Sequence, residues 1–118
     1  MLPKLHRLTS DYDYRRLRRL GRSYPSSSFT LVVAQAKDPK TLRFGFVVSN
    51  RLDKKAVVRN RLKRLLREAV CQLLPSLRAG FDASFFAKPA LRGKTYAQVL
   101  SEVTAVLSKS PLYLRPAA

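Results

Sequence analysis

Apolar residues recur at helical spacing in three segments of the chain. The most regular segment runs over residues 56–74, where apolar positions repeat every three or four residues and form one stripe on a helix. This stripe consists of Val58, Leu62, Leu65, Leu66, Ala69 and Leu73. The pattern predicts a long helix that packs on a core through its leucines, and Pro75 predicts where it ends.

Two shorter helices are predicted nearer the ends of the chain. Thr9 or Ser10 can cap the first helix, which should run to about Leu20. Thr95 can cap the last helix, and Pro111 should stop it. The apolar stripe of that last helix consists of Tyr96, Val99, Leu100, Val103 and Leu107. Each of these helices therefore has one face suited to packing on a sheet.

Three segments have the composition or alternation of strands, namely residues 29–36, 42–49 and 81–88. We expect the first two to pair as an antiparallel hairpin, and we interpret residues 24–28 as a loop. The predicted order is α-β-β-α-β-α. This order is typical of an α+β sandwich in which helices pack on a small mixed sheet. We expect residues 1–118 to form one domain.

The charge of the chain indicates a binding protein, which the α+β layout alone does not. Lys and Arg number 24 against 7 Asp and Glu, which gives a formal net charge of +17, yet 46% of the residues are hydrophobic. A folded chain with this excess repels itself, so a polyanion is the expected partner. Nucleic acid is the first candidate and an anionic membrane surface the second. A solvated basic surface without a partner is the remaining interpretation.

The sequence also indicates a compartment. No apolar run approaches the roughly 20 residues that span a bilayer, and the opening residues do not resemble a signal peptide. The lone cysteine, Cys71, cannot form an internal disulfide, which suits a reducing compartment. We therefore expect a cytoplasmic protein with no membrane association.

The sequence offers few residues with the type and spacing that catalysis requires. The one histidine, His6, and Cys71 do not have the spacing of metal ligands. Asp11 and Asp13 stand two residues apart on a predicted helix, so they do not share a face, and their place in its first turn explains them. We therefore expect no catalytic residue and no metal site in this chain.

The polar side of the long helix is the first candidate binding surface. Asn60, Lys63, Arg64 and Arg67 lie opposite the apolar stripe, and Arg59 and Arg61 lie at its flanks. This face carries one sign of charge and lacks the acidic partners at i,i+4 that solvated helix faces use. Arginine offers a planar fork of donors to phosphate oxygens. The face therefore predicts contact with RNA or DNA.

Residues 56–68 resemble the signature helix of the protein subunit of bacterial ribonuclease P, with Arg59-Asn60-Arg61 as the RNR motif of that family. The likeness covers most of the chain. It includes Asp13-Tyr14 in the first helix and residues 43–49 in the strand that leads to the motif. The resemblance implies an α/β sandwich with an unusual left-handed βαβ crossover. The general rule for βαβ units would favour a right-handed crossover.

The resemblance further implies a small partner of a large catalytic RNA. Together they would cut precursor tRNA and release its 5′ leader, with Mg²⁺ bound mainly by the RNA, no further protein partner, and no activity of the protein alone. On this basis the RNA subunit would contact Arg59, Asn60, Arg61, Lys63, Arg64 and Arg67.

The single-stranded leader would lie in a cleft between the first helix and the sheet. The residues implied there are Tyr14, Arg18, Phe29, Val32, Ser49, Asn50 and Arg51. Arg18 and Val32 stand where the family has aromatic side chains, so we expect electrostatic contact to replace part of the base stacking.

Two other interpretations stay open. A ribosomal protein or a general structural RNA-binding protein would share the charge and the α+β layout, but it would not depend on a leader. A DNA-binding protein would place the basic helix in a major groove, although no helix-turn-helix pairing is evident in the sequence.

Overall fold

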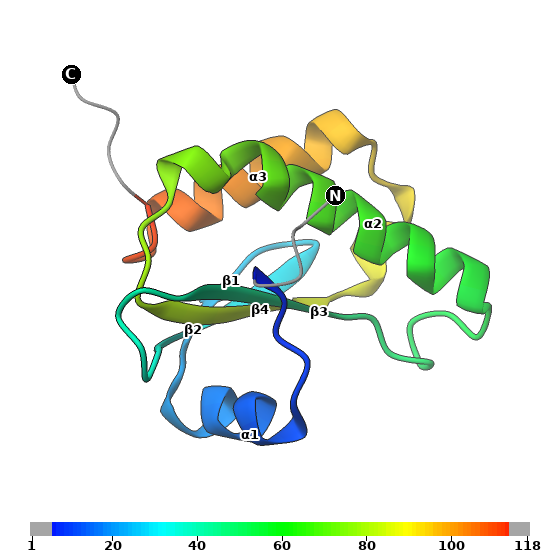
Figure 1. Cartoon of the computed structure of the whole chain (residues 1–118). Coiled ribbons are helices and arrows are strands. Elements are labelled where there is room, and N and C mark those ends of the chain that lie inside the picture. The colour runs from blue at the N-terminus through cyan, green and yellow to red at the C-terminus, as the bar shows by residue number, and fades with distance from the viewer. Residues whose placement is uncertain (1–5, 114–118) are drawn as a thin grey trace.

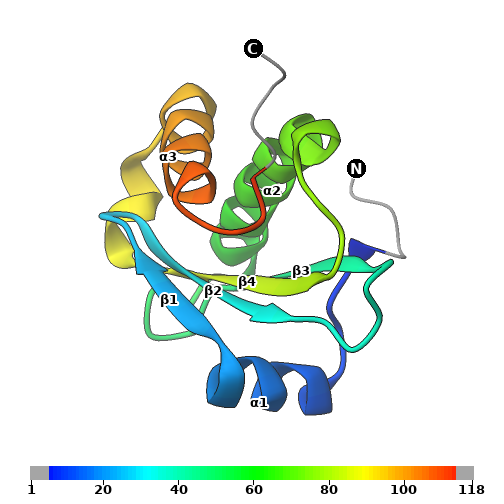
Figure 2. The same ribbon diagram turned by 90° about the vertical axis from the view of Figure 1, so that its left-hand side faces the viewer.

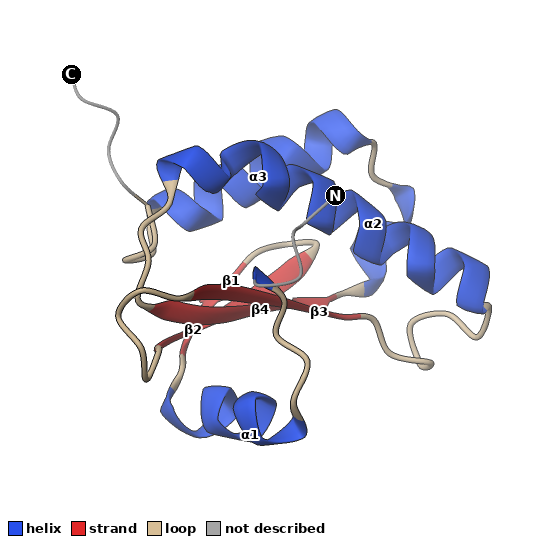
Figure 3. Cartoon of the chain, in the orientation of Figure 1, coloured by secondary structure: helices blue, strands red, loops and turns tan. Residues whose placement is uncertain are grey.

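A computed structural model describes residues 6–113 of the chain. The described part has three α-helices and four strands (Figure 1). Along the chain they follow in the order α1 (Asp11–Leu20), β1 (Arg22–Pro25), β2 (Phe29–Gln35), β3 (Leu42–Val47), α2 (Ala56–Leu73), β4 (Phe81–Ala87) and α3 (Tyr96–Ser108). Short 3-10 turns follow α2 (Leu74–Ser76) and β4 (Pro89–Gly93). The predicted helices are confirmed, and so is the α+β class (Figure 3).

The predicted hairpin between residues 29–36 and 42–49 is wrong. The strand order is β1-β2-β4-β3, with β4 antiparallel to β2 and parallel to β3. The strand β4 is buried on both faces along most of its length, so the centre of the sheet suits it. Neighbouring strands lie about 4.8 Å apart, and the six-residue connection from β2 to β3 is long enough to cross the width that β4 fills.

The structure adds a strand that the sequence pattern did not predict. Residues 22–25, part of which we interpreted as a loop, form β1 at the edge of the sheet, antiparallel to β2. An edge strand tolerates Pro25 because one side of it makes no ladder hydrogen bonds. The turn that follows is held from α3: Ser26 Oγ and Ser27 Oγ donate to Glu102 Oε1 at 2.5 and 2.6 Å, and the Ser28 backbone N–H donates at 3.2 Å.

The helices form two layers on opposite faces of the sheet. Figure 2 shows α2 and α3 together above the strands and α1 alone below them. The larger core lies under α2 and α3, where Leu62, Leu66 and Ala69 of the predicted stripe are fully buried. A smaller cluster of Leu8, Leu17 and Ala34 holds α1. The helix α1 therefore covers the face of the sheet opposite the main core.

The β3–α2–β4 crossover is left-handed. Both strands run left to right in Figure 1 and therefore away from the viewer in Figure 2. There β4 lies to the left of β3, and α2 lies above both. A right-handed crossover would place the second strand on the other side. The hand implied by the family resemblance is thus present.

Candidate nucleic-acid interface

The outer face of α2 presents cations to solvent on a helix that is fixed from behind. Asn60, Arg61 and Arg64 are exposed, while the opposite side of the helix is buried in the core. The expectation that no acidic partner stands at i,i+4 is wrong for one residue, since Arg64 Nε lies 3.4 Å from Glu68 Oε1. Both side chains are largely exposed, so this pair is weak. The helix thus holds a rigid cationic array.

The remaining basic residues of α2 are partly engaged within the chain. Arg59 Nη1 donates to the carbonyl oxygens of Asp53 and Lys54, at 2.9 and 2.8 Å. It therefore fixes the loop that enters the helix. Arg67 lies over the ring of Phe46 in β3, 5.7 Å from its centroid. Lys63 is half-buried. Of the six predicted residues, Asn60, Arg61 and Arg64 are the most available to a ligand.

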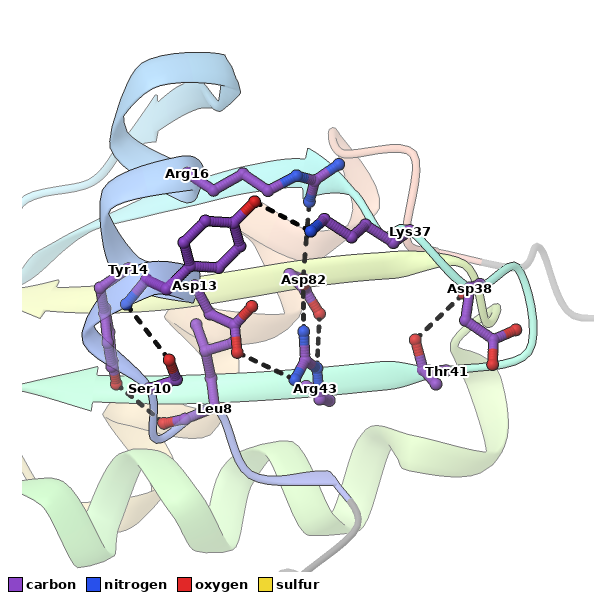
Figure 4. Close-up of polar contacts among 11 residues, drawn as sticks. Leu8, Ser10, Asp13, Tyr14, Arg16, Lys37, Asp38, Thr41, Arg43 and Asp82 are labelled. Atoms are coloured by element: carbon purple, nitrogen blue, oxygen red, sulfur yellow. Dashed lines mark hydrogen bonds and ion pairs between the residues drawn. The ribbon is translucent and has the colours of Figure 1, made fainter.

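An ion-pair network docks α1 on the sheet (Figure 4). Arg43 of β3 donates from Nε and Nη2 to the two carboxylate oxygens of Asp82, at 3.0 and 2.9 Å, and from Nη1 to Asp13 of α1 at 3.1 Å. Asp82 is only 1% exposed. Its hydrogen bonds with Arg43 outweigh burial and raise the pKa of the guanidinium. Arg16 Nη1 lies 3.9 Å from Asp82 Oδ2. These contacts set the position of α1.

Tyr14 packs directly on the backbone of Gly45 in β3. A Cβ atom at Gly45 would stand 2.7 Å from Tyr14 Cζ and 2.8 Å from Cε1, so only glycine leaves room for the ring. The Tyr14 hydroxyl donates to the carbonyl oxygen of Leu8 at 3.2 Å. Burial raises the pKa of Tyr14, which keeps this donor protonated. The ring is therefore fixed between α1 and the sheet.

A cleft opens beside this ring, between α1 and β3. It has a volume of about 280 Å³. We call it the α1 cleft, and its border consists of Asp11, Tyr14, Arg15, Arg18 and Val47. Arg18 lies 5.7 Å above the ring centroid of Phe86, on the sheet face that α1 shares. Two of the predicted leader residues, Tyr14 and Arg18, are thus brought together at one cleft.

Most of the other predicted leader residues lie near the α1 cleft without bordering it. Val32 is on the same sheet face but packs beneath α1, against the cluster that contains Leu17. Ser49, Asn50 and Arg51 are exposed in the connection that follows β3, just beyond Val47.

The placement of Phe29 in a leader cleft is wrong. Its side chain is 0% exposed and packs edge-on against Phe85, with 5.1 Å between ring centroids. Side chains alternate along a strand, and Phe29 points to the α2 and α3 face, away from α1. A residue in the main core cannot touch a ligand on the opposite face of the sheet.

Three further neighbours of the cleft, Asp11, Arg15 and Phe86, were not predicted as site residues. For Phe86 a signal was present. Phe85 and Phe86 are adjacent in β4, and adjacent strand residues point to opposite faces, so only one of them can join the main core. No comparable signal existed for Arg15, since the side of α1 that faces the cleft depends on the docking of the helix.

A second hollow continues the cationic surface around the edge of β3. It has a volume of about 170 Å³. Its border includes Tyr14, which it shares with the α1 cleft, and Lys63 and Arg67 of α2. The cationic face of α2 and the α1 cleft are therefore neighbours across one strand edge, with Tyr14 between them.

Among residues 6–113, no group of three or more His, Cys, Asp or Glu side chains is placed to hold a metal ion. No helix of this part is long and apolar enough to cross a membrane.

The chain is similar in sequence to proteins of one family. Residues 2–110 match the family model described as Ribonuclease P. A relative from Chloroflexus aurantiacus is 40% identical over 114 residues, which cover 96% of this chain and 83% of the relative. Another from Microcystis aeruginosa is 35% identical over 112 residues, which cover 92% of this chain and 93% of the relative. Both are called ribonuclease P protein component.

Solved structures show the same fold. The RNase P protein of Staphylococcus aureus aligns with a TM-score of 0.84 and 25% identity, covering 93% of this chain and 99% of that one. The RNase P protein of Thermotoga maritima aligns with a TM-score of 0.79 and 23% identity, covering 88% of this chain and 96% of that one.

Proposed function

This chain belongs to the ribonuclease P protein family, and from the geometry above we propose how it serves that endoribonuclease. The protein is a subunit of the holoenzyme and a partner of its RNA. In our proposal the outer face of α2 binds the catalytic RNA, and the α1 cleft binds the 5′ leader of precursor tRNA. Residues 1–118 act as one RNA-binding domain, and the enzyme then removes the leader to give the mature tRNA 5′ end.

One observation carries the first half of this proposal. Asn60, Arg61 and Arg64 stand exposed on a helix whose opposite side is fully buried, so their backbone is fixed before any ligand arrives. Groups that are already ordered lose less conformational entropy on binding. Guanidinium groups also match phosphate oxygens in geometry and charge. The face therefore suits the phosphates of a folded RNA.

The second half rests on the shape and the chemistry of the α1 cleft. It is narrow and open, and its walls present the cations Arg15 and Arg18 beside the aromatic ring of Tyr14. Single-stranded nucleic acid is bound by this combination, because phosphates meet the cations and bases can stack on a ring. A mature tRNA without a leader has nothing to place there. The cleft therefore supports discrimination of substrate from product.

The contribution of the protein is positioning and electrostatics. Catalytic RNA and precursor tRNA repel each other as polyanions, and a chain with a net charge of +17 reduces that repulsion where they meet. Fixing the leader beside the RNA subunit lowers the entropy cost of aligning the scissile bond. In this proposal the RNA carries the chemistry and its Mg²⁺. We place the enzyme in the cytoplasm.

The test is 5′ processing of a precursor tRNA by a bacterial ribonuclease P RNA at low magnesium, with and without this protein. We expect strong stimulation that requires the protein. Arg61→Ala should weaken assembly with the RNA and lower the slope of log K against log salt by about 1, while Arg92→Ala, at an exposed arginine of the turn after β4, should not.

The rival function, a ribosomal or general structural RNA-binding protein, makes the opposite prediction. It would bind ribosomal or generic RNA tightly and give no stimulation of leader removal. If the Arg61 and Arg92 variants have equal salt slopes, α2 is not part of the RNA interface, even if the protein stimulates processing.

A further inference from the structure

The side of α1 that faces away from the sheet forms a third cationic hollow. It has a volume of about 280 Å³. Its border consists of Tyr12, Arg15, Arg16 and Arg19. Lys37, from the connection after β2, adds a further cation: its Nζ lies 4.5 Å from the ring centroid of Tyr12 and donates to the Tyr12 hydroxyl at 2.9 Å. We call these five residues the outer α1 face.

The protein itself neutralises this surface only in part, through Arg16, whose Nη1 lies 3.9 Å from Asp82 Oδ2. Asp13 and Asp82, the nearest acidic groups of the docking network, are both engaged by Arg43. Among residues 6–113, Arg15 and Arg19 make no hydrogen bond or ion pair with another side chain. Tyr12 is 58% exposed, which is unusual for an aromatic side chain. Exposed arginines around an exposed ring are the features that single-stranded RNA uses.

The outer α1 face continues the α1 cleft. Arg15 borders both, so the two hollows meet at one side chain. Their order around α1 runs from Tyr14 and Val47 in the cleft, past Arg15, to Arg19 and Tyr12 outside. Asp11 is the one acidic residue on the border of the cleft, so a strand that leaves the cleft over Arg15 passes this carboxylate before it arrives on the outer face.

The position of α1 limits which RNA can reach it. Figures 1 and 2 both place α1 on the opposite side of the sheet from α2 and α3. RNA held on the outer face of α2 would therefore reach the outer α1 face only around the edge of β3 and past the α1 cleft. The RNA strand in the α1 cleft, in contrast, is already adjacent to it.

We propose that the outer α1 face binds the part of the 5′ leader upstream of the nucleotides held in the α1 cleft. Arg15, Arg19 and Lys37 would contact its phosphates, and Tyr12 would offer a ring face to a base. Because every RNA sequence has phosphates and bases that can stack, this contact would make affinity depend on the length of the leader rather than on its sequence. The inference rests on the function proposed above, since it extends the path of the same strand.

The experiment measures the affinity of the assembled holoenzyme for uncleavable precursor tRNAs whose leaders grow one nucleotide at a time. The variant is Arg19→Ala with Lys37→Ala, which spares the border of the α1 cleft. The control is Arg92→Ala with Lys109→Ala, which removes one exposed arginine and one exposed lysine elsewhere. Affinity is measured over a range of salt concentrations.

For the unaltered protein, affinity should rise again once the leader extends beyond the α1 cleft. The Arg19/Lys37 variant should lose this second rise and lower the salt slope for long leaders by about 1.4, the value for two phosphate contacts on a single strand. Short leaders should bind it normally.

Three results would overturn the inference or its basis. If the two double variants bind long leaders with equal affinity, the outer α1 face does not contact the leader. Affinity that stops rising at the end of the cleft would show that the strand does not continue there. If even a short leader gave no advantage over none, the leader cleft itself would be refuted, and the extension with it.

Discussion

Gly45→Ala should push Tyr14 out of its position between α1 and the sheet. The added methyl carbon would stand 2.7 and 2.8 Å from two carbons of the Tyr14 ring, closer than carbon atoms approach in folded proteins. The clash is with a ring that is half-buried and that donates a hydrogen bond to the carbonyl oxygen of Leu8. The strand backbone cannot easily yield either, because β3 is paired to β4 along its length. The ring must therefore move.

Two costs add in this variant. Overpacking of a well-packed site costs about 1–3 kcal/mol, and loss of the Tyr14–Leu8 hydrogen bond costs about 0.5–1.5 kcal/mol. We therefore expect Gly45→Ala to lower the free energy of unfolding by about 1.5–4.5 kcal/mol, measured by urea denaturation with an unchanged m value. Gly93→Ala is the matched control, because nothing lies within 4 Å of a Cβ atom there, and its effect should stay within about 0.5 kcal/mol.

A double-mutant cycle identifies the clashing partner. In a Tyr14→Ala background the ring is absent, so Gly45→Ala should cost much less than it does in the unaltered protein. If Gly45→Ala costs the same in both backgrounds, Tyr14 is not what the methyl group meets, and the packing argument is refuted. The same variant should also weaken leader binding, because Tyr14 borders the α1 cleft.

Two further predictions concern buried or hydrogen-bonded carboxylates. Asp82→Asn removes the bidentate partner of Arg43, which is partly exposed and keeps its hydrogen bond to Asp13, so we expect a loss of about 1.5–3 kcal/mol in the free energy of unfolding; a loss below about 0.5 kcal/mol would show that the network does not hold α1. For Glu102, burial alone raises the pKa, but hydrogen bonds from Ser26, Ser27 and Ser28 lower it to about 2. Because the folded pKa lies below the usual 4.5, this stabilisation is complete above pH about 4.5 and is lost as pH falls towards 2. The stability difference between the unaltered protein and Glu102→Gln should therefore shrink across that window, and a constant difference would contradict the assignment.

The sequence predicted what is local and missed what depends on distant partners. Helix ends follow from caps close in the chain, and Ser10 and Thr95 accept hydrogen bonds from the first turns of α1 and α3 as expected. The pairing of β3 with β4 does not follow from alternation, which fixes the faces of a strand but not its neighbour. The strand β1 escaped prediction because Glu102, far along the chain, stabilises its turn.

The same division holds for the candidate site. A helical wheel correctly placed Asn60 and Arg64 on the exposed side of α2, whereas Lys63 and Arg67, predicted for the same face, are half-buried. Arg59 was not recognised as a structural side chain, since the carbonyls of Asp53 and Lys54 that it binds depend on the path of the preceding loop. Phe29 was misplaced because the family likeness gives a position in the sequence, whereas the cleft lies on one face of the sheet.

The use of acidic residues explains how a chain of this charge folds and still binds RNA. The 7 carboxylates stand in helix turns, loop hydrogen bonds or ion pairs of the protein itself: Asp11, Asp13, Asp38, Asp53, Glu68, Asp82 and Glu102. Asp13, Asp82 and Glu102 join different elements and the other four make local contacts, so few carboxylates are left to neutralise the 24 basic side chains. Repulsion among those side chains opposes the compact state, and it is relieved when a polyanion binds the folded form. Binding of RNA should consequently stabilise the fold, so that assembly of the holoenzyme and the stability of this subunit depend on each other.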